Sequence, residues 1–172
     1  MFTIATGRYN NETWEASVRY RTRRQLACIY APPYKLAENI DPNTPVFIIE
    51  MNNETNQIMG IGLIKNRLVT DRVYKVQEDT NCNRYIYIGQ HHLSREVLER
   101  YNPFLVYVLD EILFKGYTHS KRGSGLTKIP EQVLNLDVCE GMDVKKEIRT
   151  IFVHHFKQAI LDKTCSAPKH AP

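Results

Sequence analysis

The sequence lacks the features that mark membrane-spanning, secreted and disulfide-stabilised proteins. No uninterrupted apolar run approaches the roughly 18–20 residues that a membrane helix needs. Residues 1–12 do not combine a basic start with an apolar block, so we expect no secretory signal. The four cysteines are spaced far apart, and a chain of 172 residues can form a core without disulfides. We therefore expect reduced thiols, no membrane partner, and a cytoplasmic or nuclear location.

Catalytic and metal-binding motifs are also missing from the sequence. The chain contains no GxSxG, HExxH, GxxxxGK[ST] or GxGxxG pattern and no CxxC or CxxH pair. The adjacent histidine pairs at 91–92 and 154–155 lie on predicted elements in which neighbouring side chains point in different directions, which does not suit a shared metal ion. We therefore expect no metal, no cofactor and no catalytic residue, and we favour a binding module over an enzyme.

Three single residues have two interpretations each. Cys28 or Cys139 could act as a nucleophile beside a distant histidine, whereas a buried, inert thiol is the commoner case. Glu50 could be a poised acid at the end of an apolar strand, whereas the solvent-facing end of that strand is the simpler interpretation. The sequence alone does not decide between them.

Apolar patterning predicts one α+β domain. The composition, 42% hydrophobic and 24% charged, is typical of a globular protein. Short β-branched and aromatic runs predict strands at 1–6, 25–30, 44–52, 58–66, 72–76 and 84–93, the third and fourth as a hairpin. Capping residues and helical periodicity predict helices at 11–20, 94–101, 102–116, 129–136 and 143–163. This order favours a curved, mixed sheet with flanking helices.

The predicted C-terminal helix is amphipathic. Its apolar stripe consists of Val144, Ile148, Ile151, Phe152, Phe156 and Ile160. We expect the helix, residues 141–164, to pack on the domain formed by residues 1–140, although the same stripe could be a docking or homodimer surface. Residues 165–172 are expected to be a frayed tail.

Two windows of the sequence are basic and free of acidic residues. The first lies between Glu15 and Glu38, and the second covers residues 114–130, which also hold three glycines. Two basic patches beside a sheet fit a groove that follows a phosphate backbone, because Lys and Arg supply charge and glycine lets backbone N–H groups approach an anion. Two solvated surface patches are the alternative. Tyrosines and Trp14 near the first window could stack on bases, although Trp14 has the helical spacing of a core residue.

Four stretches of the chain form a recognisable series: FTIATGRYNNETWEASVRY, TPVFIIEMNNETNQIMGIGLI, YIYIG and THSKRGSGLTKIPEQVL. In this order they resemble YTH domains and the related EVE domains, which belong to the PUA-like superfamily. The resemblance covers roughly residues 2–135. It implies a partial barrel with flanking helices and a pocket for one flipped base, in a domain that reads modified bases in RNA or DNA.

The resemblance and the charge pattern together define two sets of candidate residues. The base pocket is expected to contain Tyr9, Asn10, Asn11, Thr13, Trp14 and Tyr30. The phosphate-binding residues are expected to be Arg8, Arg21, Arg23, Arg24, Lys121, Arg122, Ser124 and Gly125. Since the chain has a single Trp, we expect a pocket for a base, modified or not, in place of the usual methyladenosine cage. The expected partner is RNA or DNA that is single-stranded or has a flipped base.

An enzyme is the alternative function. PUA-like relatives of the ASCH type include hydrolases and nucleases that act on nucleosides or RNA, with a lysine paired with a carboxylate or threonine in the same pocket. In this sequence Lys121, Thr127 and Glu50 are the candidates for that role.

Overall fold

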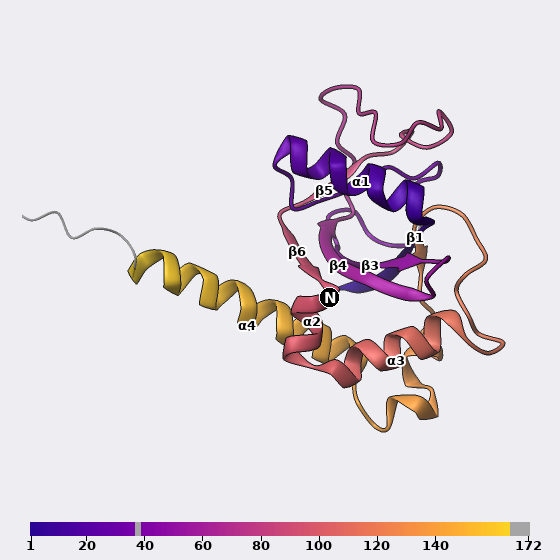
Figure 1. Ribbon diagram of the computed structural model, residues 1–172, viewed down its shortest axis with the longest axis vertical. Helices are drawn as coiled ribbons and strands as arrows, with labels where there is room; N and C mark the ends of the chain where they lie inside the picture. The colour runs from indigo at the N-terminus through magenta and orange to yellow at the C-terminus, as the bar shows by residue number, and fades with distance from the viewer. Residues whose placement is uncertain (37–38, 166–172) are drawn as a thin grey trace, which may run out of the picture.

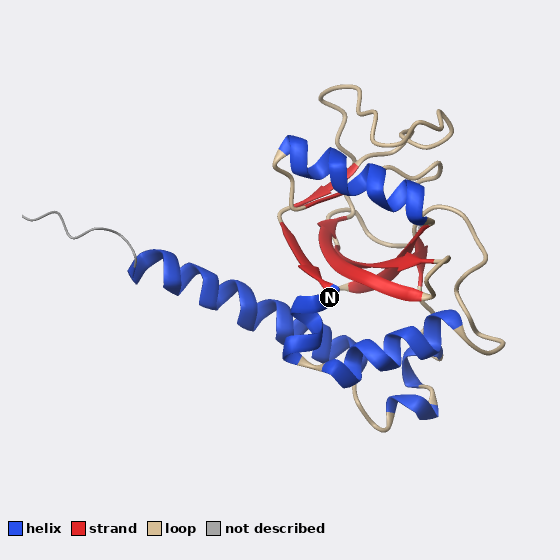
Figure 2. Cartoon of the chain, viewed as in Figure 1, coloured by secondary structure: helices blue, strands red, loops and turns tan. Residues whose placement is uncertain are grey.

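The computed structural model describes residues 1–36 and 39–165, with side chains described through Lys157. The predicted α+β class is confirmed, with helices on both sides of a sheet (Figure 2). The strands are β1 Thr3–Tyr9, β2 Cys28–Tyr30, β3 Pro45–Asn52, β4 Gln57–Lys65, β5 Tyr87–Gly89, β6 His91–Ser94 and β7 Thr127–Lys128. The α-helices are α1 Asn11–Arg24, α2 Arg95–Tyr101, α3 Pro103–Phe114 and α4 Val144–Cys165, and short 3-10 helices span Val133–Asn135 and Asp137–Cys139.

The main sheet is mixed. Its five strands follow the order β6-β4-β3-β1-β7, with β1 parallel to β3 and the other pairs antiparallel. The predicted hairpin is confirmed as β3 and β4, whose pairing shifts register between Glu50 and Met51. Strands β2 and β5 form a separate two-stranded sheet. The strands do not close into a barrel, so the structure supports a mixed α+β sheet without establishing the PUA-like form.

Side chains alternate between the two faces of β3, which places different residues under different helices. Phe47 and Ile49 pack into the larger core, together with α2, α3 and the first half of α4. Ile48 packs with β2 and β5 on the opposite face, and Glu50 shares that face because it lies two residues further on. Figure 1 shows α1 over this second face and α3 and α4 under the first.

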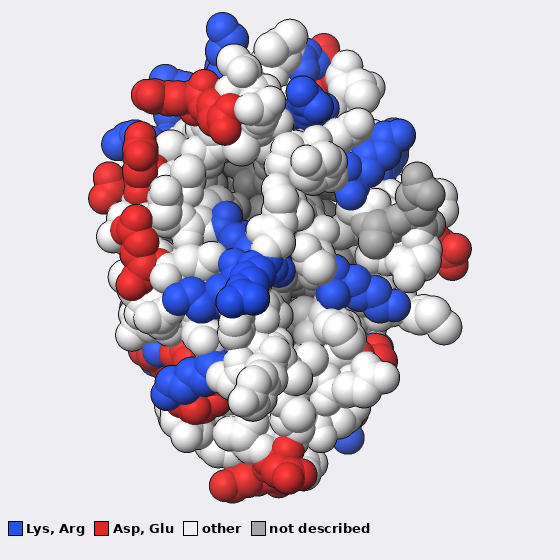
Figure 3. Space-filling view, turned by 90° about the vertical axis from the view of Figure 1, so that its right-hand side faces the viewer, with Lys and Arg blue, Asp and Glu red and all other residues white. Residues whose placement is uncertain are grey.

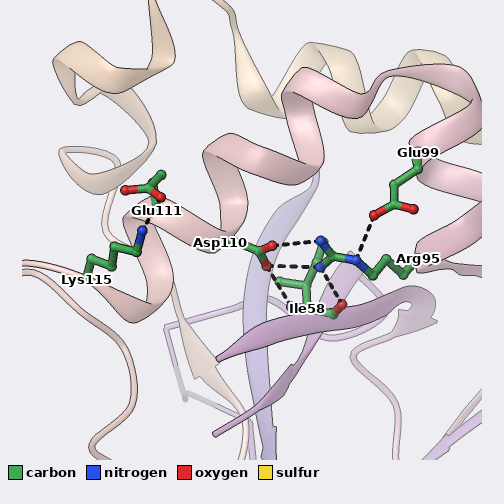
Figure 4. A network of polar contacts seen from close by, with 6 residues as sticks. All are labelled: Ile58, Arg95, Glu99, Asp110, Glu111 and Lys115. Atoms are coloured by element: carbon green, nitrogen blue, oxygen red, sulfur yellow. Dashed lines mark hydrogen bonds and ion pairs between the residues drawn. The ribbon is translucent and has the colours of Figure 1, made fainter. Parts of the chain in front are cut away.

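One ionic contact fastens α2 and α3 to the start of β4. The Arg95 guanidinium donates to both Asp110 carboxylate oxygens, at 3.2 and 2.9 Å, and to the Ile58 carbonyl oxygen at 3.1 Å. Asp110 in turn accepts the Ile58 backbone N–H at 2.8 Å (Figure 4). The bidentate geometry fixes the two helices relative to β4, since it holds both planar groups in one orientation.

Several predicted elements differ from the structure. Strand β1 continues through Gly7 to Tyr9, where a break was expected, because parallel pairing with β3 runs along its whole length. No strand forms at 72–76, since none of the described strands pairs with this segment, which runs as loop and packs with Tyr20 of α1. The predicted strand at 84–93 is divided at Gln90 between the two sheets. Residues 129–136 contain only one turn of 3-10 helix.

Helix α4 starts as predicted and packs on the domain through its first half. The Asp143 carboxylate accepts the Lys146 backbone N–H at 2.9 Å and caps the helix. Four residues of the predicted stripe, Val144, Ile148, Ile151 and Phe152, are buried in the larger core. The second half extends away from the body of the molecule in Figure 1. Cys165, expected in the tail, ends the helix, while the Ile160 side chain and residues 166–172 lie outside the described part. The homodimer through this helix stays a prediction.

Candidate functional site

The junction between β1 and α1 forms one wall of a cavity of about 210 Å³, which we call the Tyr9 cavity. Its other walls come from β2 with the prolines that follow it, from loop residues 76–77 and 82, and from loop residues 123–126. These segments are far apart in the sequence, so the fold assembles the cavity. Figure 3 looks at the side of the molecule that carries the late loop, where a hollow opens beside a group of Lys and Arg side chains.

Both predicted sets contribute residues to the Tyr9 cavity. Tyr9, Thr13 and Tyr30 of the base set line it. So do Arg8, Ser124 and Gly125 of the phosphate set. Among the described residues that line it, none is a carboxylate and Arg8 is the only charged one. The end of β1, the first half of α1 and the late glycine-bearing loop therefore face the same hollow.

Asn10 and Asn11 do not line the cavity, because both are engaged in forming the start of α1. The Asn10 side chain accepts the Thr13 backbone N–H at 2.8 Å, and the Thr13 hydroxyl accepts the Asn10 backbone N–H at 3.0 Å. This reciprocal pair is a capping box. The Asn11 side-chain oxygen accepts a hydrogen bond from Asn52 at 2.8 Å. Both asparagines therefore orient the helix that carries Thr13.

Trp14 lies beside the cavity. Its ring packs edge-on against Tyr9, with centroids 5.4 Å apart. The Arg21 guanidinium lies over the same ring at 5.0 Å and contacts Glu50 at 3.4 Å. The Arg21 side chain is 15% exposed, so it supports the cavity wall from behind and does not face an incoming phosphate.

The remaining predicted cations occupy two other places. The Arg23 and Arg24 guanidinium groups lie over the Tyr20 ring at 5.6 and 5.9 Å, toward the C-terminal end of α1. Lys121 donates to Asn56 at 2.6 Å. Arg122 is exposed in the loop segment that immediately precedes the cavity residues 123–126.

Arg8 organises the late loop. Its guanidinium donates to the Thr127 hydroxyl at 3.0 Å, to the Gly125 carbonyl oxygen at 3.4 Å and to the Ser120 carbonyl oxygen. Partial burial lowers the pKa of Arg8 because desolvation disfavours the charged form. In the loop, Gly123 and Gly125 adopt φ of +121° and +72°, which side chains disfavour. Arg8 therefore links the C-terminal end of β1 to a loop whose shape depends on glycine.

A buried polar cluster, formed by Glu50, Tyr30, His92 and Arg21, lies behind the cavity. Glu50 is 1% exposed and does not face solvent, so the simpler interpretation of this residue was wrong. Its carboxylate accepts the Tyr30 hydroxyl at 2.9 Å, and His92 Nε2 lies 2.8 Å from the other oxygen. Burial and the Glu50 charge raise the pKa values of the Tyr9 and Tyr30 hydroxyls. The cluster therefore keeps the two ring hydroxyls protonated.

Some lining residues gave no recognisable signal in the sequence. Ser17 of α1 is buried in the cavity wall. Gln77 donates to the Thr13 carbonyl oxygen at 3.0 Å. Pro32 and Pro33 form part of the wall, although the sequence indicated only that they end a strand. Ser17 has the spacing of a residue facing the sheet, one turn from Thr13, and this spacing was the one available clue.

The three candidates for a hydrolase each have a different side-chain partner. Lys121 contacts Asn56, Thr127 contacts Arg8 and Glu50 belongs to the buried cluster. None of the three lines the Tyr9 cavity. Within the described residues, no three His, Cys, Asp or Glu side chains gather as a metal site. Cys28, Cys82 and Cys139 are free thiols, and burial followed by the Glu50 charge raises the pKa of Cys28 to about 12, as suits an inert thiol.

None of the described helices combines the length and apolarity needed to cross a bilayer. Comparison with models of known protein families, with curated proteins and with solved structures finds no match.

Proposed function

We propose that this protein is a nucleic-acid-binding module of PUA-like type, whose Tyr9 cavity takes one flipped base, modified or not, from RNA or DNA. The observation that carries the proposal is the meeting of the two predicted residue sets around one hollow. Tyr9 and Tyr30 from the base set and Arg8 and the 124–125 loop from the phosphate set all line it.

The size of the cavity favours a single small planar group. Its volume of about 210 Å³ is below the roughly 300–1,000 Å³ typical of sites for drug-sized ligands. A flipped base would enter while its sugar and phosphate stay outside. The apolar wall of Ile29, Val76 and Leu126 suits the faces of a base, and the hydroxyl and amide groups of Thr13, Ser17 and Gln77 suit its polar edge.

The charge around the cavity favours an anionic backbone at its mouth. Arg8 lies in the wall, and Lys121 and Arg122 precede the cavity residues of the loop, which has no acidic residue between 114 and 130. Each phosphate contact made to a single strand is expected to add about −0.7 to the slope of log K against log salt. Binding should therefore weaken markedly as salt rises.

Fluorescence anisotropy with short labelled RNA and DNA oligonucleotides, carrying unmodified or modified bases, tests the proposal. The matched variants are Ser124→Glu and Ser124→Lys, because Ser124 is an exposed residue of the cavity wall. We expect the Glu variant to weaken binding and the Lys variant to strengthen it, both without loss of stability. Recovery of intact oligonucleotide distinguishes binding from hydrolysis. Equal affinity of both variants, or binding that does not change with salt, would contradict the proposal.

A second pair of variants separates the base from the backbone. Tyr9→Ala should weaken the binding free energy by about 1–3 kcal/mol, the usual contribution of one base–aromatic stack. It should also reduce the preference of the protein for one base over another. Arg122→Ala should lower affinity equally for all bases and reduce the salt slope by about 0.7. Arg100→Ala is the control, because Arg100 is exposed on α2, away from the cavity.

A further inference from the structure

A second hollow, which we call the α4 groove, lies between helix α4 and the end of the sheet. Its volume is about 610 Å³. Its apolar lining includes Phe2, Phe47, Leu63, Phe152, Val153 and Phe156. It shares no lining residue with the Tyr9 cavity, so the proposed base binding leaves it unexplained.

The floor of the α4 groove is a continuous row of rings. Phe2 packs on Phe47 with centroids 5.4 Å apart, and Phe47 packs on Phe152 at 4.9 Å. Phe152 contacts Phe156 at 5.7 Å, and Phe156 contacts His91 at 4.4 Å. Phe47 and Phe152 are buried, while the other three rings are only partly covered. The row therefore offers an apolar surface that the described residues leave open.

The rim of the α4 groove carries positive charge at two separate points. Arg149, Val153 and Lys157 follow one another at intervals of four residues, so they share a face of α4. All three are exposed, and Val153 has 44% of its surface accessible. Along the helix axis, eight residues separate the two cations by about 12 Å. Of the side chains described through Lys157, no carboxylate lines the groove.

The surroundings of the groove are also positively charged. An adjoining hollow shares Phe2, Arg149, Val153 and Lys157 with the α4 groove and adds Lys146 and His154, as well as Lys145, which is paired with Glu131 at 2.9 Å. Among its described lining residues the one carboxylate is Asp143, which accepts the Lys146 backbone N–H as the cap of α4. The complementary occupant therefore combines large apolar side chains with negative charge.

We infer that the α4 groove binds an acidic amphipathic peptide segment of a partner protein, with apolar side chains placed between two acidic residues. The distance between the two cations is the reason for choosing this occupant. A single-chain lipid has one anionic end and would pair with one cation only. A segment with Asp or Glu about two helical turns apart can pair with both cations, while the side chains between them contact the rings. This arrangement follows the usual binding of a helix in an apolar groove.

Selection from a random 16-residue peptide library on the immobilised full chain tests the inference. We expect enriched peptides to hold two acidic residues seven or eight positions apart, with aromatic or aliphatic residues between them. The Val153→Asp protein serves as counter-target, because this exposed change puts a negative charge at the centre of the groove without touching the core. The absence of enriched peptides, or enrichment of peptides without acidic residues, would overturn the inference.

The affinity of an enriched peptide is then measured against charge-reversed proteins. Arg149→Glu combined with Lys157→Glu should weaken binding at least tenfold, while Arg100→Glu, an exposed reversal on α2, should leave it unchanged. Amide chemical-shift changes should centre on Phe2, Phe152 and Val153. Two other outcomes would overturn the inference by identifying a different occupant. One is concentration-dependent dimerisation that Val153→Asp abolishes. The other is binding to anionic vesicles that the double charge reversal weakens as much as it weakens binding of the peptide.

Discussion

The Tyr30 hydroxyl donates a hydrogen bond of 2.9 Å to Glu50, so a side chain that lines the Tyr9 cavity is fixed by a carboxylate that is 1% exposed. The same carboxylate contacts His92 at 2.8 Å and Arg21 at 3.4 Å. Three elements that are distant in the sequence, α1, β2 and β6, therefore meet at one residue of β3. The shape of the cavity wall depends on this buried group.

We predict that Glu50→Ala destabilises the fold by about 3–5 kcal/mol, the usual cost of removing one partner from a buried ion pair. The reason is that Arg21 would keep a largely buried charge without its counter-ion. Urea unfolding monitored by circular dichroism measures the free energy of unfolding. Glu15→Ala is the matched control, because Glu15 pairs with Arg19 3.9 Å away at a position where both are exposed. That change should cost less than about 1 kcal/mol, and similar costs for the two variants would show that the buried cluster does not hold the fold.

Gly62→Ala should also damage the support of the cavity. A Cβ atom at this position would lie 2.1 Å from the Tyr30 hydroxyl oxygen and 2.9 Å from the Cys28 sulfur, so Tyr30 would have to leave Glu50. We expect a clear loss of stability in thermal unfolding. Gly7→Ala is the comparison, since its Cβ would meet the end of the Leu126 side chain at 3.2 Å. It should affect stability less but reduce ligand binding, because Gly7 lines the cavity. Equal loss of stability in both would contradict this assignment.

Stability should fall at alkaline pH. Burial, with the Glu50 charge as second cause, raises the pKa of Cys28 from 9.0 to about 12 and also raises the pKa values of Tyr9 and Tyr30 above 10.0. Because the folded state holds these protons more tightly, the stability they provide is complete below about pH 9 and is lost as pH rises toward about 12. Each group contributes a slope of up to about 1.4 kcal/mol per pH unit in that range.

Urea midpoints measured at about pH 8 and about pH 11 check this dependence. The wild-type midpoint should be clearly lower at the higher pH. Cys28→Ala removes the thiol and should make the decline shallower, whereas Cys82→Ala is a control at a less buried thiol. A midpoint that is the same at both values would mean that these groups ionise freely in the folded state.

The sequence predicted the order of elements well where local signals and tertiary context agree. Asn10 caps α1, Asp143 caps α4 and the hairpin of β3 and β4 follows from two apolar runs around a polar turn. Prediction failed where tertiary contacts decide the outcome. Strand β1 runs through Gly7 because β3 pairs with it, whereas none of the described strands pairs with residues 72–76, which stay irregular.

The candidate site was predicted in part, for a similar reason. The family resemblance and the charge pattern together indicated Tyr9, Thr13 and Arg8, which the structure places at one cavity. The same reasoning could not distinguish an exposed cation from a largely buried one. Arg21 is largely buried. Glu50 was the hardest case. The sequence shows glycines at 60 and 62 in the predicted partner strand, but it does not show the register that leaves room for the Glu50 carboxylate at Gly60 and for the Tyr30 hydroxyl at Gly62.

Arg8→Lys should loosen the late loop while leaving the net charge unchanged. Arg8 joins the Ser120 and Gly125 carbonyl oxygens to the Thr127 hydroxyl, and a lysine ammonium cannot reach three acceptors in the geometry of a planar guanidinium. We expect faster amide hydrogen exchange across residues 120–127 and weaker oligonucleotide binding with an almost unchanged salt slope. Arg122→Lys is the control, because Arg122 is exposed and its replacement keeps the charge. If exchange in the loop stays at the wild-type rate while binding falls, Arg8 contacts the ligand directly and its part in shaping the loop is secondary.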